Sequence, residues 1–178
     1  MCLDFLDEVM TGGEEVVDYG CGSGVLTVGA MLLGARHVTA VDIDPDILTH
    51  AVENFRLNGL QVPGQVTATH TRFILPGELK GNVVVANILV GALKRLLPVL
   101  VLAVEEGGLL CLSGFRRADM PVLKREYGMY MDWDDGMETS GSHPVWGEWM
   151  RIVGRPKPGM REDMKEEIEA SLSEVAVS

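Results

Sequence analysis

Cysteine is scarce, and its spacing excludes a disulfide scaffold. The 178 residues contain three cysteines, an odd number with no framework spacing. Cys21 lies in a glycine-rich loop and Cys111 in an apolar strand pattern, so both are predicted to be reduced, small, buried residues. We therefore expect a reducing compartment and a cytoplasmic protein, or an organellar one if a targeting segment lies upstream.

Three other features are missing. The four histidines do not pair with each other or with a cysteine at ligand spacing, so no metal site is predicted. The longest apolar stretch, residues 83–104, is broken by Lys94, Arg95 and Pro98, which excludes a membrane span there. Basic residues number 15 against 26 acidic ones, a formal net charge of −11, so nucleic acid is not expected as a direct partner.

What is present is an alternation of short β-branched runs with helical patterns, typical of βαβ units and a mainly parallel sheet. The expected strands are residues 15–19, 38–42, 65–69, 82–86 and 109–113, followed by two late strands near 129–138 and 148–153 that form an antiparallel hairpin. The expected helices are residues 25–33, 45–57, 89–104 and 119–126. Asp44 is predicted to cap the second helix, with Pro45 at its first position.

Two changes of composition set the predicted boundaries. Residues 1–156 are expected to form one domain and residues 157–178 an acidic tail, because residues 160–178 carry two basic and six acidic side chains. The first ten residues resemble the amphipathic end of a longer element, so we expect a chain truncated at its N-terminus.

The loop after the first strand carries the clearest chemical signal. Asp18-Tyr19-Gly20-Cys21-Gly22-Ser23-Gly24 joins a strand to a helix, and its glycines let a ligand approach the backbone closely. Val25 stands where a dinucleotide fingerprint needs its third glycine, which argues against a nicotinamide dehydrogenase. A carboxylate at Asp18 would repel a pyrophosphate and attract the amino group of S-adenosylmethionine.

Two further positions extend this prediction. Asp42, at the end of the second strand, can accept hydrogen bonds from both ribose hydroxyls, and Ile43 can offer an apolar face to adenine. Asn87 ends the central fourth strand, where its side-chain oxygen can hold an amine for methyl transfer; alternatively, it caps the following helix. The predicted cofactor residues are Asp18, Gly20, Cys21, Gly22, Gly24, Asp42, Ile43 and Asn87. Asn87 is also the predicted catalytic residue, and Cys21 is interpreted as a small loop residue, not a nucleophile.

These stretches resemble the ribosomal protein L-eleven methyltransferase family, the PrmA type, over residues 1–155. The first two motifs, Val17 to Leu26 and Val41 to Pro45, are widespread among class I methyltransferases. The stretches Val85-Ala86-Asn87-Ile88-Leu89, Leu112-Ser113-Gly114-Phe115 and Gly147-Glu148-Trp149 are more specific. The resemblance implies a Rossmann-like α/β fold with a mostly parallel seven-stranded sheet and helices on both faces. It also implies methyl transfer to α-amino and lysine ε-amino groups of a protein of the large ribosomal subunit.

Departures from the family pattern leave alternatives open. The family's N-terminal recognition domain and a Gly-Thr-Gly-x-His-x-Thr-Thr segment are absent, so we expect weak cofactor binding and poor or lost activity. Asn82 replaces an aspartate, which is interpreted as a small structural change. A class I methyltransferase acting on another protein or a small molecule, or an inactive cofactor-binding or interaction module, remains possible. Trp133, Trp146 and Trp149 are interpreted as hairpin packing.

Overall fold

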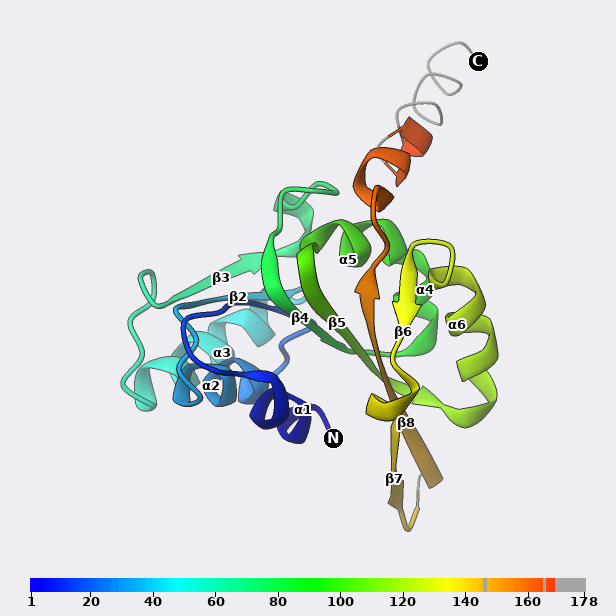
Figure 1. Cartoon of the computed structure of the whole chain (residues 1–178). Helices are drawn as coiled ribbons and strands as arrows, with labels where there is room; N and C mark the ends of the chain where they lie inside the picture. Colours follow the sequence, from blue (N-terminus) through cyan, green and yellow to red (C-terminus); the bar gives the residue numbers. More distant parts are fainter. Residues whose placement is uncertain (146, 165, 169–178) are drawn as a thin grey trace.

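The computed structural model describes residues 1–145, 147–164 and 166–168. In this part of the chain, eight strands form one sheet in the order β3-β2-β1-β4-β5-β8-β6, with β7 paired to β8 (Figure 1). The parallel strands are β1 (Glu15–Tyr19), β2 (His37–Asp42), β3 (Val66–His70), β4 (Gly81–Asn87) and β5 (Val104–Arg116). The antiparallel strands are β6 (Met131–Trp133), β7 (Thr139–His143) and β8 (Gly147–Pro156).

Helices cover both faces of this sheet (Figure 1). On one side lie α1 (Cys2–Val9), α2 (Val25–Leu32) and α3 (Pro45–Leu57); on the other lie α4 (Val90–Arg95), α5 (Leu97–Ala103) and α6 (Met120–Tyr127). Because side chains alternate along a strand, Val83 and Val85 pack toward α1 and α2, whereas Val84 packs toward α5. Two apolar layers therefore hold the central strands rigidly between them.

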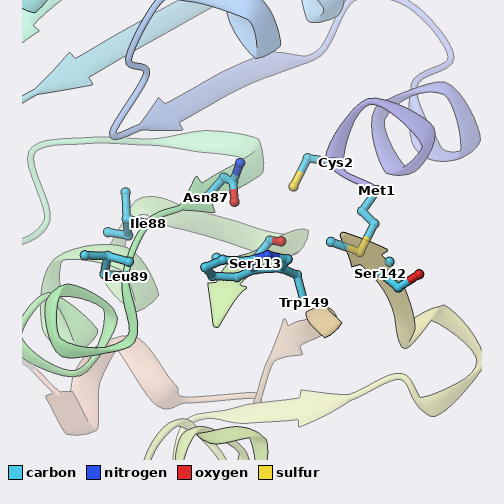
Figure 2. A pocket seen from close by; sticks show the side chains of 10 residues that line it. Met1, Cys2, Asn87, Ile88, Leu89, Ser113, Ser142 and Trp149 are labelled. Carbon is cyan, nitrogen blue, oxygen red and sulfur yellow. The ribbon is translucent and has the colours of Figure 1, made fainter. Parts of the chain in front are cut away.

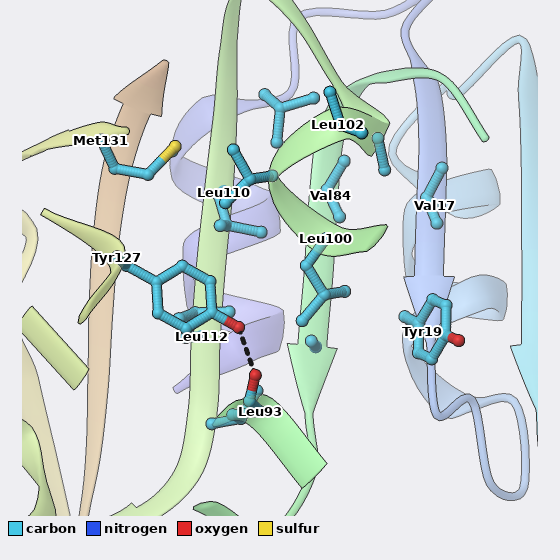
Figure 3. Close-up of a cluster of buried hydrophobic side chains, with 14 of the residues drawn as sticks. Val17, Tyr19, Val84, Leu93, Leu100, Leu102, Leu110, Leu112, Tyr127 and Met131 are labelled. Carbon is cyan, nitrogen blue, oxygen red and sulfur yellow. Dashed lines mark hydrogen bonds between the residues drawn. The ribbon is translucent and has the colours of Figure 1, made fainter. Parts of the chain in front are cut away.

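The core under α4–α6 is closed by one buried polar contact. The Tyr127 hydroxyl donates to the Leu93 carbonyl oxygen at 2.6 Å, and the ring packs beside Leu112 and Met131 (Figure 3). A buried hydroxyl needs such a partner, so this bond fixes α6 against the end of α4.

The predicted α/β fold with helices on both faces and a C-terminal hairpin is confirmed, with one more strand than the seven expected. The predicted late strand over residues 129–138 is wrong as a single element, because η3 (Asp135–Met137) interrupts it. Asp134 turns the chain there, accepting from the Gly136 N–H at 3.0 Å. Within the predicted range only β6 is a strand; β7 begins after it, at Thr139, and both strands pair with β8.

Two other predicted elements differ in extent. The helix expected over residues 89–104 is two helices that meet at Leu96, because Pro98 lacks an N–H and belongs in a first helical turn. The strand expected over residues 109–113 is the 13-residue strand β5, which begins at Val104 and pairs irregularly with β4 before Leu109. Asp44 caps α3 as predicted, accepting from the N–H groups of Asp46 and Ile47.

The two ends of the described chain pack onto the same body. Phe5 and Leu6 of α1 are fully buried. Residues 160–164 and 166–168 are helical, and Met160 and Met164 are buried against the α5 side of the core. The boundary between a domain at 1–156 and a tail at 157–178 stays a prediction, but the first part of that tail contributes to the core.

Candidate functional site

The glycine loop connects β1 to α2 at the carboxyl edge of the sheet. Gly20, Gly22 and Gly24 all have positive φ (80°, 55° and 83°), a backbone conformation that other residues rarely adopt. The N–H groups of Gly20 and Cys21 both donate to the Val41 carbonyl oxygen, at 2.7 and 2.9 Å. The loop is thereby fixed to the end of β2, beside Asp42.

Asp42 is buried and holds the loop from the other side. Its Oδ2 accepts from the Gly22 N–H at 3.0 Å and its Oδ1 from the Asp44 N–H at 3.1 Å. Each carboxylate oxygen has further lone pairs, so both can accept from a ligand as well. Ile43 follows with its side chain 73% exposed, an apolar surface at the same edge.

Asp18 lies beneath the loop instead of at its surface. Its Oδ2 accepts from the backbone N–H and the hydroxyl of Thr27, at 3.1 and 2.8 Å, which fastens the start of α2 to the end of β1. Its Oδ1 is buried without a partner in the described residues. Burial raises the pKa of Asp18 to about 6, and the Asp42 charge adds to this shift.

A cavity of about 280 Å³, here the Asp42 cavity, opens beside the loop. Its lining residues are Tyr19, Gly20, Asp42, Ile43, Thr71, Ile88, Ala92, Arg95 and Leu96. The polar side chains of the lining are those of Tyr19, Asp42, Thr71 and Arg95 and the rest is apolar, so the cavity suits a flat apolar group with hydroxyls at one end.

A second cavity of about 580 Å³, here the Asn87 cavity, lies at the tips of β4 and β5 (Figure 2). It is lined by Met1, Cys2, Asn87, Ile88, Leu89, Ser113, Gly114, Gly141, Ser142 and Trp149. Ile88 is common to both cavities. A ligand group reaching past Ile88 would therefore meet a second molecule bound beside Asn87.

Ile88 is fixed from two sides by glycines. Its side chain occupies the space that a β-carbon on Gly20 would need, and its backbone lies within 3 Å of where a β-carbon on Gly114 would stand. Its N–H donates to the Ser113 carbonyl oxygen at 3.2 Å. Gly20 and Gly114 are thus required for close packing around the point where the cavities meet.

Asn87 does not cap the following helix. Helix α4 has Leu89 at its N-cap position, with no side-chain hydrogen bond there. The Asn87 side chain is exposed, points into the second cavity (Figure 2), and has no hydrogen bond among the described residues. The capping alternative is excluded, and the amide is available to a ligand.

The predicted site residues thus fall into two groups. Gly20, Asp42, Ile43 and Asn87 line the two cavities, whereas Asp18, Cys21, Gly22 and Gly24 do not. A β-carbon on Gly24 would collide with the Phe55 ring, so this glycine serves packing between α2 and α3. Burial, with the charges of Asp18 and Asp42, raises the pKa of Cys21 to about 12, which makes it a poor nucleophile.

Sequence reasoning missed the walls of the Asn87 cavity. Trp149, interpreted as hairpin packing, lines the cavity, while Trp133 packs near Tyr127 and donates its indole N–H to the Lys124 carbonyl oxygen; Trp146 lies outside the described residues. Met1 and Cys2 also line it. The buried Arg151 guanidinium holds them there by donating to the Met1 carbonyl oxygen at 2.8 Å. No local sequence pattern predicts this hydrogen bond, because its two residues are 150 positions apart in the chain.

Asn82, which departs from the family pattern, bridges three strands. Its side-chain oxygen accepts from the Glu15 N–H at 2.9 Å, and its amide nitrogen donates to the Glu105 carboxylate at 2.8 Å. An aspartate could not make the second bond, so the interpretation as a structural change has a physical basis.

The described residues contain no group of three or more His, Cys, Asp or Glu side chains that could hold a metal ion. None of the helices in this part of the chain has the length and apolar character needed to cross a bilayer.

Comparison with known proteins identifies the family to which this chain belongs. Residues 1–157 match the family profile described as "Ribosomal protein L11 methyltransferase (PrmA)". The chain belongs to this family. Proteins named ribosomal protein L11 methyltransferase from Aeromonas salmonicida and Shewanella sp. strain ANA-3 are 37% and 36% identical over 155 and 157 residues, or 87% and 88% of the chain. The matched region is 50% of each relative, so the chain spans about half the length of these curated relatives.

A solved structure agrees with the family assignment. The crystal structure of a ribosomal protein L11 methylase from Lactobacillus delbrueckii subsp. bulgaricus superposes with a TM-score of 0.74 at 28% identity, covering 88% of this chain and 77% of that one. The resemblance inferred from the sequence motifs is therefore confirmed at the level of family and fold.

Proposed function

We propose that this chain carries the catalytic site of an S-adenosylmethionine-dependent methyltransferase that methylates amines of a ribosomal protein. The observation that carries the proposal is the meeting of two cavities at Ile88, one bordered by Asp42 and the other by Asn87. Transfer of a methyl group requires two ligands to face each other across a short gap, with water excluded. Two cavities that share Ile88 as a lining residue support such an arrangement, with one ligand bound on each side of this side chain.

The residues of the first cavity fit the cofactor. Asp42 has lone pairs free for ribose hydroxyls, and Ile43 offers an exposed apolar face for adenine. The space above Gly22 is open, since a β-carbon there would meet nothing within 4 Å. The unpartnered Asp18 Oδ1 marks where a positively charged amino group would find a carboxylate. When bound, the cofactor supplies an electrophilic methyl group on a sulfonium.

Asn87 would orient the nucleophile in the second cavity. Its side-chain oxygen can accept a hydrogen bond from a neutral amine, which leaves the nitrogen lone pair free to point past Ile88. A lysine amine with an ordinary pKa of about 10.4 must first lose its proton, and no carboxylate or imidazole lines the described cavity to take it. The proton acceptors left are solvent and the Cys2 thiolate, since Cys2 lines the cavity and a hydrogen bond with Cys111 lowers its pKa to about 7.

The substrate proposal follows from the family. The relatives are named for ribosomal protein L11, so that protein is the first substrate to test, at its lysine and α-amino groups. We assign catalysis to residues 1–156 and no chemistry to the acidic segment 157–178. The free thiols of Cys2, Cys21 and Cys111 support a cytoplasmic location.

Calorimetric titration with S-adenosylmethionine tests the first step. We expect a heat of binding that disappears with Asp42→Ala, and no change in NADH fluorescence. Absence of heat at millimolar ligand would refute cofactor use by this chain and leave the interaction-module alternative.

Methyl-labelled cofactor tests the second step. Label is expected on amines of ribosomal protein L11 and not on a variant whose modified lysines are replaced by arginine and whose α-amine is acetylated. Label on small molecules alone, with none on the protein, would instead support the small-molecule alternative.

A further inference from the structure

Trp149 forms one wall of the Asn87 cavity, and the Arg116 guanidinium stacks on its indole ring. The Arg116 guanidinium carbon lies 4.1 Å from the centroid of the Trp149 ring. Arg116 is absent from the residues that line the cavity, whereas Trp149 is among them. The guanidinium therefore stacks on the ring face turned away from the cavity, and the other side of the indole would contact a molecule in the cavity.

Two strand contacts hold this stack in place. Arg116 and Trp149 face each other across the antiparallel pairing of β5 and β8. Next to them, Arg117 makes two hydrogen bonds to the Glu148 carboxylate, at 2.7 and 2.9 Å. The indole is thus fixed as a rigid wall opposite the tip of β4.

The Arg116 charge is not neutralised by a neighbour. Among the described residues no carboxylate lies within ion-pairing distance of its guanidinium, although its backbone N–H donates to Asp119. The adjacent Glu148 is held by Arg117 instead. The positive charge of Arg116 therefore lies unpaired, among the described residues, behind the Trp149 ring.

The other elements around the cavity do not supply a compensating carboxylate. On α1, Asp4 is paired with the terminal ammonium of Met1, and the exposed Glu8 lies 3.8 Å from Arg151. Arg151, on β8, is itself a buried cation beside Met1. The described lining contains no carboxylate, and its titratable side chain is Cys2, whose thiol pKa is lowered to about 7, chiefly by a hydrogen bond with Cys111 and also by the positive charges of the Met1 ammonium and Arg151. In a chain of net charge −11, the cations Arg116 and Arg151 thus lie beside a lining without a carboxylate.

We infer that Arg116, acting through Trp149, makes the Asn87 cavity select the neutral form of an amine over its ammonium form. This inference rests on the proposed function and identifies a specificity-determining residue for it. An indole ring with no cation stacked on it attracts ammonium groups through its quadrupole. A guanidinium already stacked on one face interacts with that quadrupole, and its charge repels a second cation at the other face. Since only the neutral amine has the lone pair needed for methyl transfer, this charge favours the reactive form.

Two probes of the same shape test the inference without any methyl transfer. One is N-acetyl-Nε-trimethyllysine methylamide, which is permanently cationic; the other is its neutral analogue with a tert-butyl head group. Binding to the full chain is followed through the indole N–H signals in a proton–nitrogen correlation spectrum, with the Trp149 signal assigned from Trp149→Phe. The neutral probe is expected to bind roughly three- to tenfold more tightly, as one charge at about 8 Å in a partly solvated site predicts.

Three variants separate charge from packing. Arg116→Gln is expected to remove the preference for the neutral probe, and Arg116→Lys to retain most of it. Arg125→Gln, which removes an exposed cation on α6, should leave the ratio of the two affinities unchanged. Thermal unfolding confirms that each variant is folded.

Several outcomes would overturn the inference. Tighter binding of the trimethylammonium probe would make Trp149 an attractive wall for cations, and an unchanged ratio in Arg116→Gln would remove Arg116 from the selection. No perturbation of the Trp149 signal by either probe would show that the amine side chain does not bind there. Failure of the proposed function shows itself separately, as absence of cofactor binding and of label transfer.

Discussion

The side chain of Ile88 fills the space directly above the α-carbon of Gly20, so that no β-carbon could be accommodated there. Gly20 begins the loop after β1, and Ile88 follows the last residue of β4. The contact joins the two neighbouring strands at the point where the cavities meet. This pair therefore fixes the position of Ile88, the residue that lines both cavities.

Gly20→Ala is expected to destabilise the protein and to abolish cofactor binding. Two effects add: positive φ costs a non-glycine residue about 1–2 kcal/mol, and the collision with Ile88 costs a further 1–3 kcal/mol or so. Urea unfolding measures the loss of stability, and calorimetric titration measures the loss of cofactor binding.

Gly77→Ala is the matched control, because Gly77 has a similar φ of 87° but open space around its α-carbon. It should show the backbone cost alone. The double variant Gly20→Ala with Ile88→Ala should recover the part of the loss due to collision. If Gly77→Ala and Gly20→Ala were equally destabilised, the contact with Ile88 would have no energetic role.

Asp42→Asn is expected to weaken S-adenosylmethionine binding roughly tenfold or more, because hydrogen bonds to a charged group are worth about 1.5–3 kcal/mol. The amide can replace only one of the two acceptor oxygens that hold Gly22 and Asp44. Asp44→Asn is the control: asparagine caps helices as well as aspartate does, so binding should change less than twofold. Equal losses in both variants would point to general disturbance of this turn.

Asn87→Ala should separate catalysis from cofactor binding. The Asn87 side chain makes no hydrogen bond within the described protein, so its removal should leave the unfolding free energy within about 0.5 kcal/mol. The rate of label transfer is expected to fall about 100-fold through misplacement of the amine, a much larger effect than any loss of cofactor affinity. An unchanged rate would mean that Asn87 does not hold the amine.

Asn82→Ala is expected to lower stability and to leave cofactor binding intact, the reverse of the effect expected for Asn87→Ala. It removes bonds to Glu15 and Glu105 at the far end of β4, so it should lower stability by about 1–3 kcal/mol without changing the cofactor affinity of the folded protein.

The loop and the strand ends could be predicted because their signals are local. Alternating glycines indicate positive φ values. An acid that directly follows a buried strand must lie at the carboxyl end of that strand, where a parallel sheet binds its ligand. The Asn87 cavity could not be predicted in this way. Trp149 reaches it only because β8 runs antiparallel to β5, and Met1 reaches it through the buried Arg151. Such distant pairings leave no periodic pattern in the sequence.

The division of the late strand shows the same limit. Residues 129–138 have the composition of one extended segment, but the Asp134 side chain competes for the backbone and turns it. Likewise, the position of Asp18 before the glycines indicated a site residue but not how deep its carboxylate lies. Its burial beneath Thr27 is a consequence of helix packing that spacing alone does not reveal.

Asp18 also gives the protein a distinctive dependence on pH. Its pKa is raised from an ordinary 3.8 to about 6 in the folded chain, chiefly by burial. Between these values the folded state binds more protons than the unfolded state, so this group makes stability fall as the pH rises from about 4 to about 6. Ionised Asp18 then destabilises the fold by about 3 kcal/mol at neutral pH.

Asp18→Asn isolates this effect, because an amide can still accept from Thr27 but carries no charge. Urea unfolding of both proteins from pH 4 to pH 8 should show the variant gaining relative stability through that window and staying constant above it. Saturating S-adenosylmethionine should reduce the difference in stability, since its amino group would pair with the ionised carboxylate. A difference that is independent of both pH and cofactor would show that the unpartnered Asp18 oxygen plays no part in either.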